Sequence, residues 1–142
     1  MAYEDAGKQI SLPAGADLSG SQYCAVKVNA SGQVVLAGAG ETAIGILQNK
    51  PTSGRVATVM VSGVSKMVAG GAVAAGSLVA ADATGRAKVA SLAVTNTADA
   101  GAANDPLIGS SILGVALSGA AAAGVVISVL LLPMGAVATT AS

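Results

Sequence analysis

The sequence contains no histidine, phenylalanine or tryptophan, and its single cysteine is Cys24. Histidine is the commonest general base and the commonest neutral metal ligand, so its absence excludes Ser-His-Asp and Cys-His catalysis. A zinc site needs clustered cysteines and histidines, which one cysteine cannot supply. We therefore expect no catalytic residue, no cofactor site and no metal site, and we do not expect an enzyme.

Charge is also scarce. Seven Lys and Arg residues balance seven Asp and Glu residues, without the basic run that accompanies nucleic-acid binding. Direct binding to nucleic acid is therefore not expected. The lone cysteine cannot form an intrachain disulfide, which fits folding in a reducing cytoplasm, and residues 1–5 lack the features of a secretory signal.

What the chain does contain is small and apolar. Apolar residues make up 53% of it, but the only aromatic residues are Tyr3 and Tyr23, and Ala, Val and Gly dominate. Small side chains bury little area each, so folding a lone monomer yields less stabilisation than this apolar share suggests. We expect the missing burial to come from other copies or from a large partner.

Residues 112–134 contain no charge, and a run of this length is sufficient to cross a bilayer as a helix. Three glycines, Gly114, Gly119 and Gly124, interrupt the run at the spacing of strand ends, and no aromatic or basic anchor flanks it. A buried pair of strands is the favoured interpretation. A membrane protein anchored by residues 112–134 is the alternative.

An internal duplication is the most informative feature. Residues 26–34 contain an apolar run, an Asn, two small residues and a Gly, and residues 78–87 repeat this order around Asp82. A second pair of segments follows in the same order, 44–47 with 54–61 and then 113–117 with 124–131. The first pair is offset by 53 positions (Gly85 minus Gly32) and the second by 70 (Gly124 minus Gly54), so the second copy contains about 17 extra residues (70 minus 53) between its two segments. Such repetition predicts a pseudo-symmetric β architecture.

Short Val- and Ile-rich segments separated by Gly, Asn, Asp or Ser predict strands. We expect strands at residues 22–28, 33–36, 44–47, 55–61, 64–68, 72–75, 78–81, 86–89, 112–117 and 125–132. A hairpin or a bulged strand is expected at 55–68. The turns at Asn29 and Asp82 are typical of type I turns, in which the side chain caps its own backbone and a following Gly adopts positive φ.

The fold class expected is therefore all-β, a compact pseudo-duplicated β-barrel or β-sandwich of short strands with an extended N-terminal arm. Residues 1–20 form the arm, residues 21–134 form a single β domain, and residues 135–142 form a C-terminal tail. The repeat halves are expected at about 21–68 and 72–132, with an exposed loop at 95–106 where the sequence has no period.

Several of these segments together resemble the head decoration, or structural cement, proteins of tailed bacteriophages. The resemblance is found in residues 16–23, 26–28, 44–51, 57–66 and 75–79, with Asp82 and Gly85. It implies a compact β domain that binds the outside of an expanded icosahedral capsid at capsomer junctions, often as a trimer. The implied partners are the major capsid protein and other copies of the chain. The implied location is the outer surface of the virion, after synthesis in the host cytoplasm.

The N-terminal arm is the candidate contact segment. Its alternating residues can add as a strand to a neighbouring sheet, where backbone hydrogen bonds supply affinity. We expect residues 1–15 to contact the capsid or an adjacent decoration subunit. The candidate contact residues are Tyr3, Glu4, Asp5, Lys8, Ile10, Leu12 and Pro13. A tail or fibre subunit is a further alternative, because repeated apolar strands also suit stacked β structures.

Overall fold

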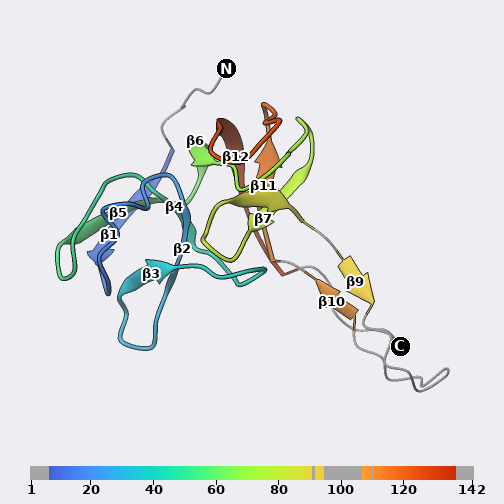
Figure 1. The fold of residues 1–142 in the computed structure, drawn as a ribbon. Coiled ribbons are helices and arrows are strands. Elements are labelled where there is room, and N and C mark those ends of the chain that lie inside the picture. Colours follow the sequence, from blue (N-terminus) through green and yellow to red (C-terminus); the bar gives the residue numbers. More distant parts are fainter. Residues whose placement is uncertain (1–6, 91, 95–106, 110, 137–142) are drawn as a thin grey trace.

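The structure is a computed structural model that describes residues 7–90, 92–94, 107–109 and 111–136. All regular elements of these residues are strands, which confirms the all-β prediction (Figure 1). In chain order they are β1 (Gln9–Pro13), β2 (Ala25–Val28), β3 (Val34–Leu36), β4 (Gly45–Leu47), β5 (Val56–Met60), β6 (Gly63–Val68), β7 (Leu78–Ala81), β8 (Ala87–Val89), β9 (Leu92–Val94), β10 (Leu107–Gly109), β11 (Ser111–Ala116) and β12 (Val126–Ala136).

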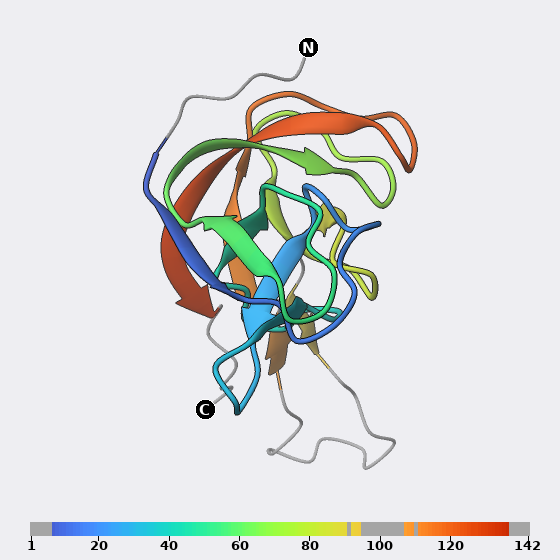
Figure 2. The same cartoon turned by 90° about the vertical axis from the view of Figure 1, so that its left-hand side faces the viewer.

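These strands form two five-stranded antiparallel sheets. The first sheet has the order β1-β5-β4-β2-β3, the second has the order β6-β12-β11-β7-β8, and β9 and β10 form a separate ribbon. The first sheet lies on the left of Figure 1 and faces the viewer in Figure 2. Each sheet keeps two edge strands, so the molecule is sandwich-like and is not a closed barrel.

The two sheets have the same strand order. If β1 to β5 are matched with β6, β7, β8, β11 and β12, every neighbour in one sheet has its equivalent in the other. The register matches as well. Val26 pairs with Leu36 in the first sheet, and Val79 pairs with Val89 in the second, both displaced by the offset of 53. The duplication visible in the sequence is therefore present in the backbone pairing.

The two capped turns are also equivalent. The Oδ1 atom of Asn29 accepts the N–H groups of Ser31 and Gln33, both at 3.0 Å. Likewise Oδ1 of Asp82 accepts the N–H groups of Thr84 and Arg86 at 2.8 and 2.9 Å. Gly32 and Gly85 follow with φ of 77° and 75°, so both predicted Asx-capped turns are confirmed.

The prediction of a hairpin at 55–68 is wrong. β5 already has β1 on one side and β4 on the other, so no edge of β5 is free for β6. The chain instead crosses to the second sheet, where β6 occupies the position that β1 occupies in the first. Gly63, with φ of 96°, permits the change of direction. The last strand of the first five-stranded sheet thus ends at Met60.

One further strand prediction and the extent of the N-terminal arm need correction. Residues 72–75 do not form a strand, since only Val73 pairs, in an isolated bridge with Ala120. In contrast, residues 9–13 of the expected arm form β1, and Ala14 and Leu18 are buried in the core. Burial of Ile10 and Leu12 against β5 explains why this segment joins its own sheet.

Residues 112–134 lie in β11, in β12 and in the connection between them, two strands that pair antiparallel with each other. Among the described residues no helix is long and apolar enough to cross a membrane. The predicted loop at 95–106 lies outside the described residues, between β9 and β10, as do residues 137–142 of the expected tail.

The core consists of two clusters. One lies on the face of the second sheet that meets the first, and contains Met67, Val79, Ile127 and Val129 together with residues of the first sheet. The other lies on the opposite face of the first sheet and contains Val26, Leu47 and Val59. The first sheet is therefore apolar on both faces.

Candidate functional site

The described residues hold no cluster of three or more His, Cys, Asp or Glu side chains that could bind a metal. Cys24 is a buried free thiol, and burial raises its pKa, although the nearby Arg86 acts in the opposite direction. A thiol with a raised pKa stays protonated and unreactive near neutral pH.

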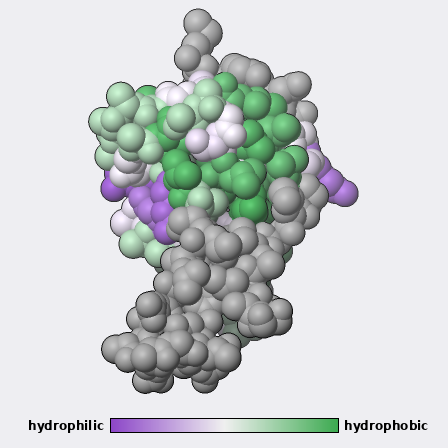
Figure 3. Space-filling model, turned by 90° about the vertical axis from the view of Figure 1, so that its right-hand side faces the viewer, coloured by the Kyte–Doolittle hydropathy of each residue, from purple (hydrophilic) through white to green (hydrophobic). Residues whose placement is uncertain are grey.

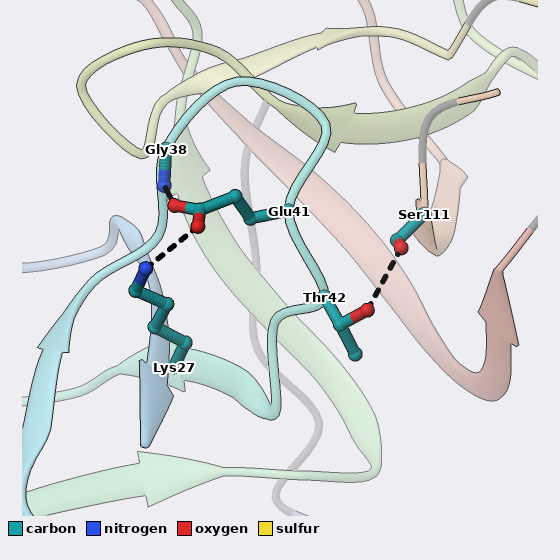
Figure 4. Close-up of polar contacts among 5 residues, drawn as sticks. All are labelled: Lys27, Gly38, Glu41, Thr42 and Ser111. Carbon is teal, nitrogen blue, oxygen red and sulfur yellow. Dashed lines mark hydrogen bonds and ion pairs between the residues drawn. The ribbon is translucent and has the colours of Figure 1, made fainter. Parts of the chain in front are cut away.

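The loop between β3 and β4 is closed by an ion pair. Nζ of Lys27 lies 2.7 Å from Oε2 of Glu41, and Oε1 of Glu41 accepts the N–H of Gly38 at 2.6 Å (Figure 4). The hydrogen bond from Lys27, followed by that from Gly38, lowers the pKa of Glu41. The carboxylate thus fixes the shape of this loop.

The same loop joins the two halves of the molecule. The hydroxyls of Thr42 and Ser111 are 3.0 Å apart, which links the loop to the start of β11 (Figure 4). The backbone of Gly40 contributes two further bonds, donating to Ala81 O at 3.0 Å and accepting from Ser111 N–H at 3.2 Å. These polar groups brace the two sheets against each other.

A second polar link lies between the sheets. Nε2 of Gln48, just after β4, donates to Oγ of Ser65 in β6 at 2.9 Å, and it also donates to the carbonyl of Ile46. Ser65 is fully buried, and a buried hydroxyl requires such a partner. Both interior polar contacts therefore serve the packing of one half on the other.

The structure places four of the seven candidate contact residues. Lys8 is exposed, and its N–H donates to Oγ of Ser62 at 3.1 Å. Ile10 and Leu12 are half-buried on the second core cluster, and Pro13 is exposed. Ile10, Leu12 and Pro13 lie in β1, an edge strand of the first sheet, and Lys8 lies directly before it. Tyr3, Glu4 and Asp5 lie outside the described residues.

An apolar surface that the sequence analysis did not identify lies on the second sheet. Hydrophobic residues gather on the side of the molecule where β7 and β11 lie (Figure 3). Leu78 is 43% exposed, and Val115 and Leu130, its neighbours across β11 and β12, are half-buried. Alignment of the two repeats matches these residues with Ala25, Ile46 and Met60 of the first half, which are fully buried. This alignment is the sequence signal that relates the surface to the interior of the molecule.

A comparison with known protein families finds a match over most of the chain. A family model described as "Phage cement protein" matches residues 22–131. No curated protein matches the sequence. The match covers β2 to β11 and part of β12, which is more than half of the chain, and with it the chain belongs to the phage cement protein family.

Proposed function

We propose that this protein binds the outer surface of an expanded phage head at the junctions between capsomers, and that it stabilises the shell there. The cement role and the location on the capsid surface follow from the family. The junction as the binding position, the major capsid protein as the partner and a homotrimer as the bound form are the finer parts of the proposal.

The observation that carries the proposal is the family match over residues 22–131. The character of the chain supports it. A cement protein needs no reactive group, and many weak contacts repeated over a shell resist internal pressure through multivalency. We infer that the protein has no enzymatic activity, and that it binds neither nucleic acid nor membrane directly.

The edge of the first sheet supports a role for the N-terminal segment. Among the described residues, β1 has a paired strand, β5, on one side, while at its end Ala14 bridges to Val34 of β3. Most of the other side of β1 therefore presents backbone groups to a partner. We propose that residues 1–8, together with this edge, contact the capsid or an adjacent subunit. In the sequence, this segment directly precedes the strand that such a partner would join.

The test is binding to purified heads. Expanded and unexpanded heads are incubated with the full chain, and the bound copies per head are counted by quantitative gel analysis. We expect saturable binding to expanded heads and a higher temperature of head rupture. Failure to bind expanded heads would contradict the proposed function.

The role of the N-terminal segment is tested with a chain that lacks residues 1–6. This deletion leaves β1 and its pairing with β5 in place. We expect lower occupancy on expanded heads with an unchanged unfolding temperature of the free protein. The matched control is Thr52→Ala, an exposed residue in a turn of the same half, which should bind like the full chain. Full occupancy by the shortened chain would eliminate the arm contact.

A further inference from the structure

The internal contact between the two sheets uses one apolar row of the first sheet. Ala25, Ile46 and Met60 lie side by side on β2, β4 and β5. All three are fully buried, in the same cluster as Met67 and Ile127 of the second sheet. We call these three residues the inner row. It is the surface by which the first half packs on the second.

The second half contains the equivalent row. Leu78, Val115 and Leu130 lie side by side on β7, β11 and β12, with the same register as the inner row. Their chain neighbours Val79 and Val129 belong to the core, so the row itself lies on the opposite face of the sheet. We call these residues the outer row. Nothing in the described part of the chain covers it as the second sheet covers the inner row, and Leu78 remains 43% exposed.

The surface that receives the inner row also has an equivalent. In the second half, Met67, Leu113 and Leu131 are 0%, 6% and 4% exposed, in the cluster that contains the inner row.

The equivalent positions in the first half are Leu12, Ile44 and Val61, which are only partly buried on the second core cluster. We call these three residues the open face. It differs from its counterpart because no sheet in the described part of the chain packs on it.

Two surfaces form the internal contact between the sheets, and the chain contains a second, partly exposed equivalent of each. The outer row corresponds to the inner row, with Leu for Ala25, Val for Ile46 and Leu for Met60. These exchanges keep the surface apolar and of similar total size, which packed interfaces tolerate. The two exposed surfaces belong to different sheets and face away from each other across the sandwich.

We propose that the outer row of one copy packs on the open face of a second copy, so that copies associate head to tail through a repetition of the internal contact. Such a contact is heterologous, and it closes into a ring when the rotation between copies permits. This inference deepens the self-association that belongs to the proposed function. It identifies the two surfaces and the occupant, a second copy of this chain.

The test uses one variant of each surface. Leu78→Lys places a charge in the outer row, and Leu12→Lys places one in the open face. Val56→Lys is the control, because Val56 is a 60% exposed apolar residue that belongs to neither surface. Oligomeric state is measured by sedimentation equilibrium in solution without heads, and folding is checked by circular dichroism.

We expect the wild-type chain and Val56→Lys to associate as the concentration rises to about 1 mM. Each single variant should associate at least about tenfold more weakly, because every contact between identical copies then contains one charged surface. A mixture of Leu78→Lys and Leu12→Lys retains one intact outer row and one intact open face. The mixture should therefore form dimers with one copy of each and no larger species.

A wild-type chain that stays monomeric throughout this range overturns the inference, as do variants that associate like wild type. If Leu12→Lys does not fold, dilution of the wild-type chain followed by methyl NMR replaces it. Methyl shifts of Leu78, Val115 and Ile44 should then change with concentration, and unchanged shifts overturn the inference. Since no head is present, this result is independent of head binding, whose failure would count against the proposed function alone.

Discussion

The two halves of the molecule share strand order, register and turn hydrogen bonds, yet they differ in which faces are covered. In the first half the inner row is buried and the open face is partly exposed. In the second half the corresponding outer row is partly exposed, and the face that receives the inner row is buried. This pattern shows that two copies of one unit can stack front to back, which leaves one apolar surface unmatched at each end.

The correspondence extends to single backbone bonds. The N–H of Gly54 donates to Ala14 O at 2.9 Å, and the N–H of Gly124 donates to Ala69 O at 2.8 Å. The halves differ in the residue at one position of positive φ. Tyr23 has φ of 65°, and its equivalent in the second half is a glycine with φ of 87°.

Positive φ is costly for a tyrosine but not for glycine. The ring of Tyr23 packs on the core cluster that contains Met67 and Ile127, and the ring centroid lies 5.8 Å from Nζ of Lys66. The first half thus tolerates a strained tyrosine because the ring fills space where the halves meet. No such contact exists at Gly76, where an added Cβ would meet open space.

The largest expected difference between the halves lies at Met67 and Leu12. Met67→Ala should lower the free energy of unfolding by about 3 kcal/mol, because it leaves a cavity in a fully packed cluster. Leu12→Ala should cost about 1 kcal/mol in dilute solution, because its site is already partly open. Urea unfolding measures both. Equal losses would mean that the two faces are equally covered.

A change that should affect both halves alike is Gly→Ala at Gly45 and Gly114. A Cβ at Gly45 would collide with the Met60 carbonyl, and one at Gly114 with the Leu130 carbonyl. Each change should destabilise by about 2 kcal/mol, as overpacking against backbone does. Gly71→Ala is the control, since its Cβ would meet nothing within 4 Å. A neutral result at either buried glycine breaks the equivalence.

The two turn glycines should respond unequally. Gly32→Ala meets open space and suffers only from positive φ, which we expect to cost about 1 kcal/mol. Gly85→Ala has the same backbone strain, and its Cβ would also lie 2.8 Å from the Ala25 carbonyl oxygen. We expect a loss of about 2 kcal/mol there. The unfolding temperatures of the two variants are compared by thermal unfolding. Equal decreases would contradict a contact between the turn at Gly85 and the first half.

The smallest expected effect concerns the ion pair between Lys27 and Glu41, two residues that both belong to the first half. Its hydrogen bonds lower the pKa of Glu41 below its ordinary value. The stabilisation is therefore present above the unfolded pKa and is lost as pH falls through the folded pKa. Lys27→Ala should raise the pKa of Glu41 toward the ordinary value, as measured by carboxyl NMR titration.

Asp17 provides the internal control in that titration. Hydrogen bonds from the Ser19 hydroxyl and N–H lower its pKa, and Lys27 takes no part in them. The pKa of Asp17 should thus be unchanged in Lys27→Ala. An unchanged pKa of Glu41 would show that the Gly38 N–H alone holds the carboxylate.

Much of the fold is predictable because it is local. The capped turns at Asn29 and Asp82 and the β-rich segments beside them can be identified from residue type and spacing alone. The 53-residue offset predicts that these hairpins are equivalent, and the register confirms it. Whether the strands form a sandwich or a closed barrel depends on whether the edge strands of each sheet pair with each other. The local sequence pattern does not show this pairing.

The rest depends on contacts between distant segments. β1 and β6 are equivalent in position, but Gln9–Pro13 and Gly63–Val68 share little sequence, so neither the role of β1 nor the crossing after Met60 could be predicted. Alternation indicates that Leu78 and Val79 lie on opposite faces of a strand. It does not indicate which face meets another sheet, and the outer row was missed for that reason.

The most direct test of the cement role is a density map of expanded heads with and without this protein. The account predicts added density on the outer surface of the shell at the junctions between capsomers, with two stacked sheets in each copy. Identical maps, or density found on the tail and not on the head, would contradict it.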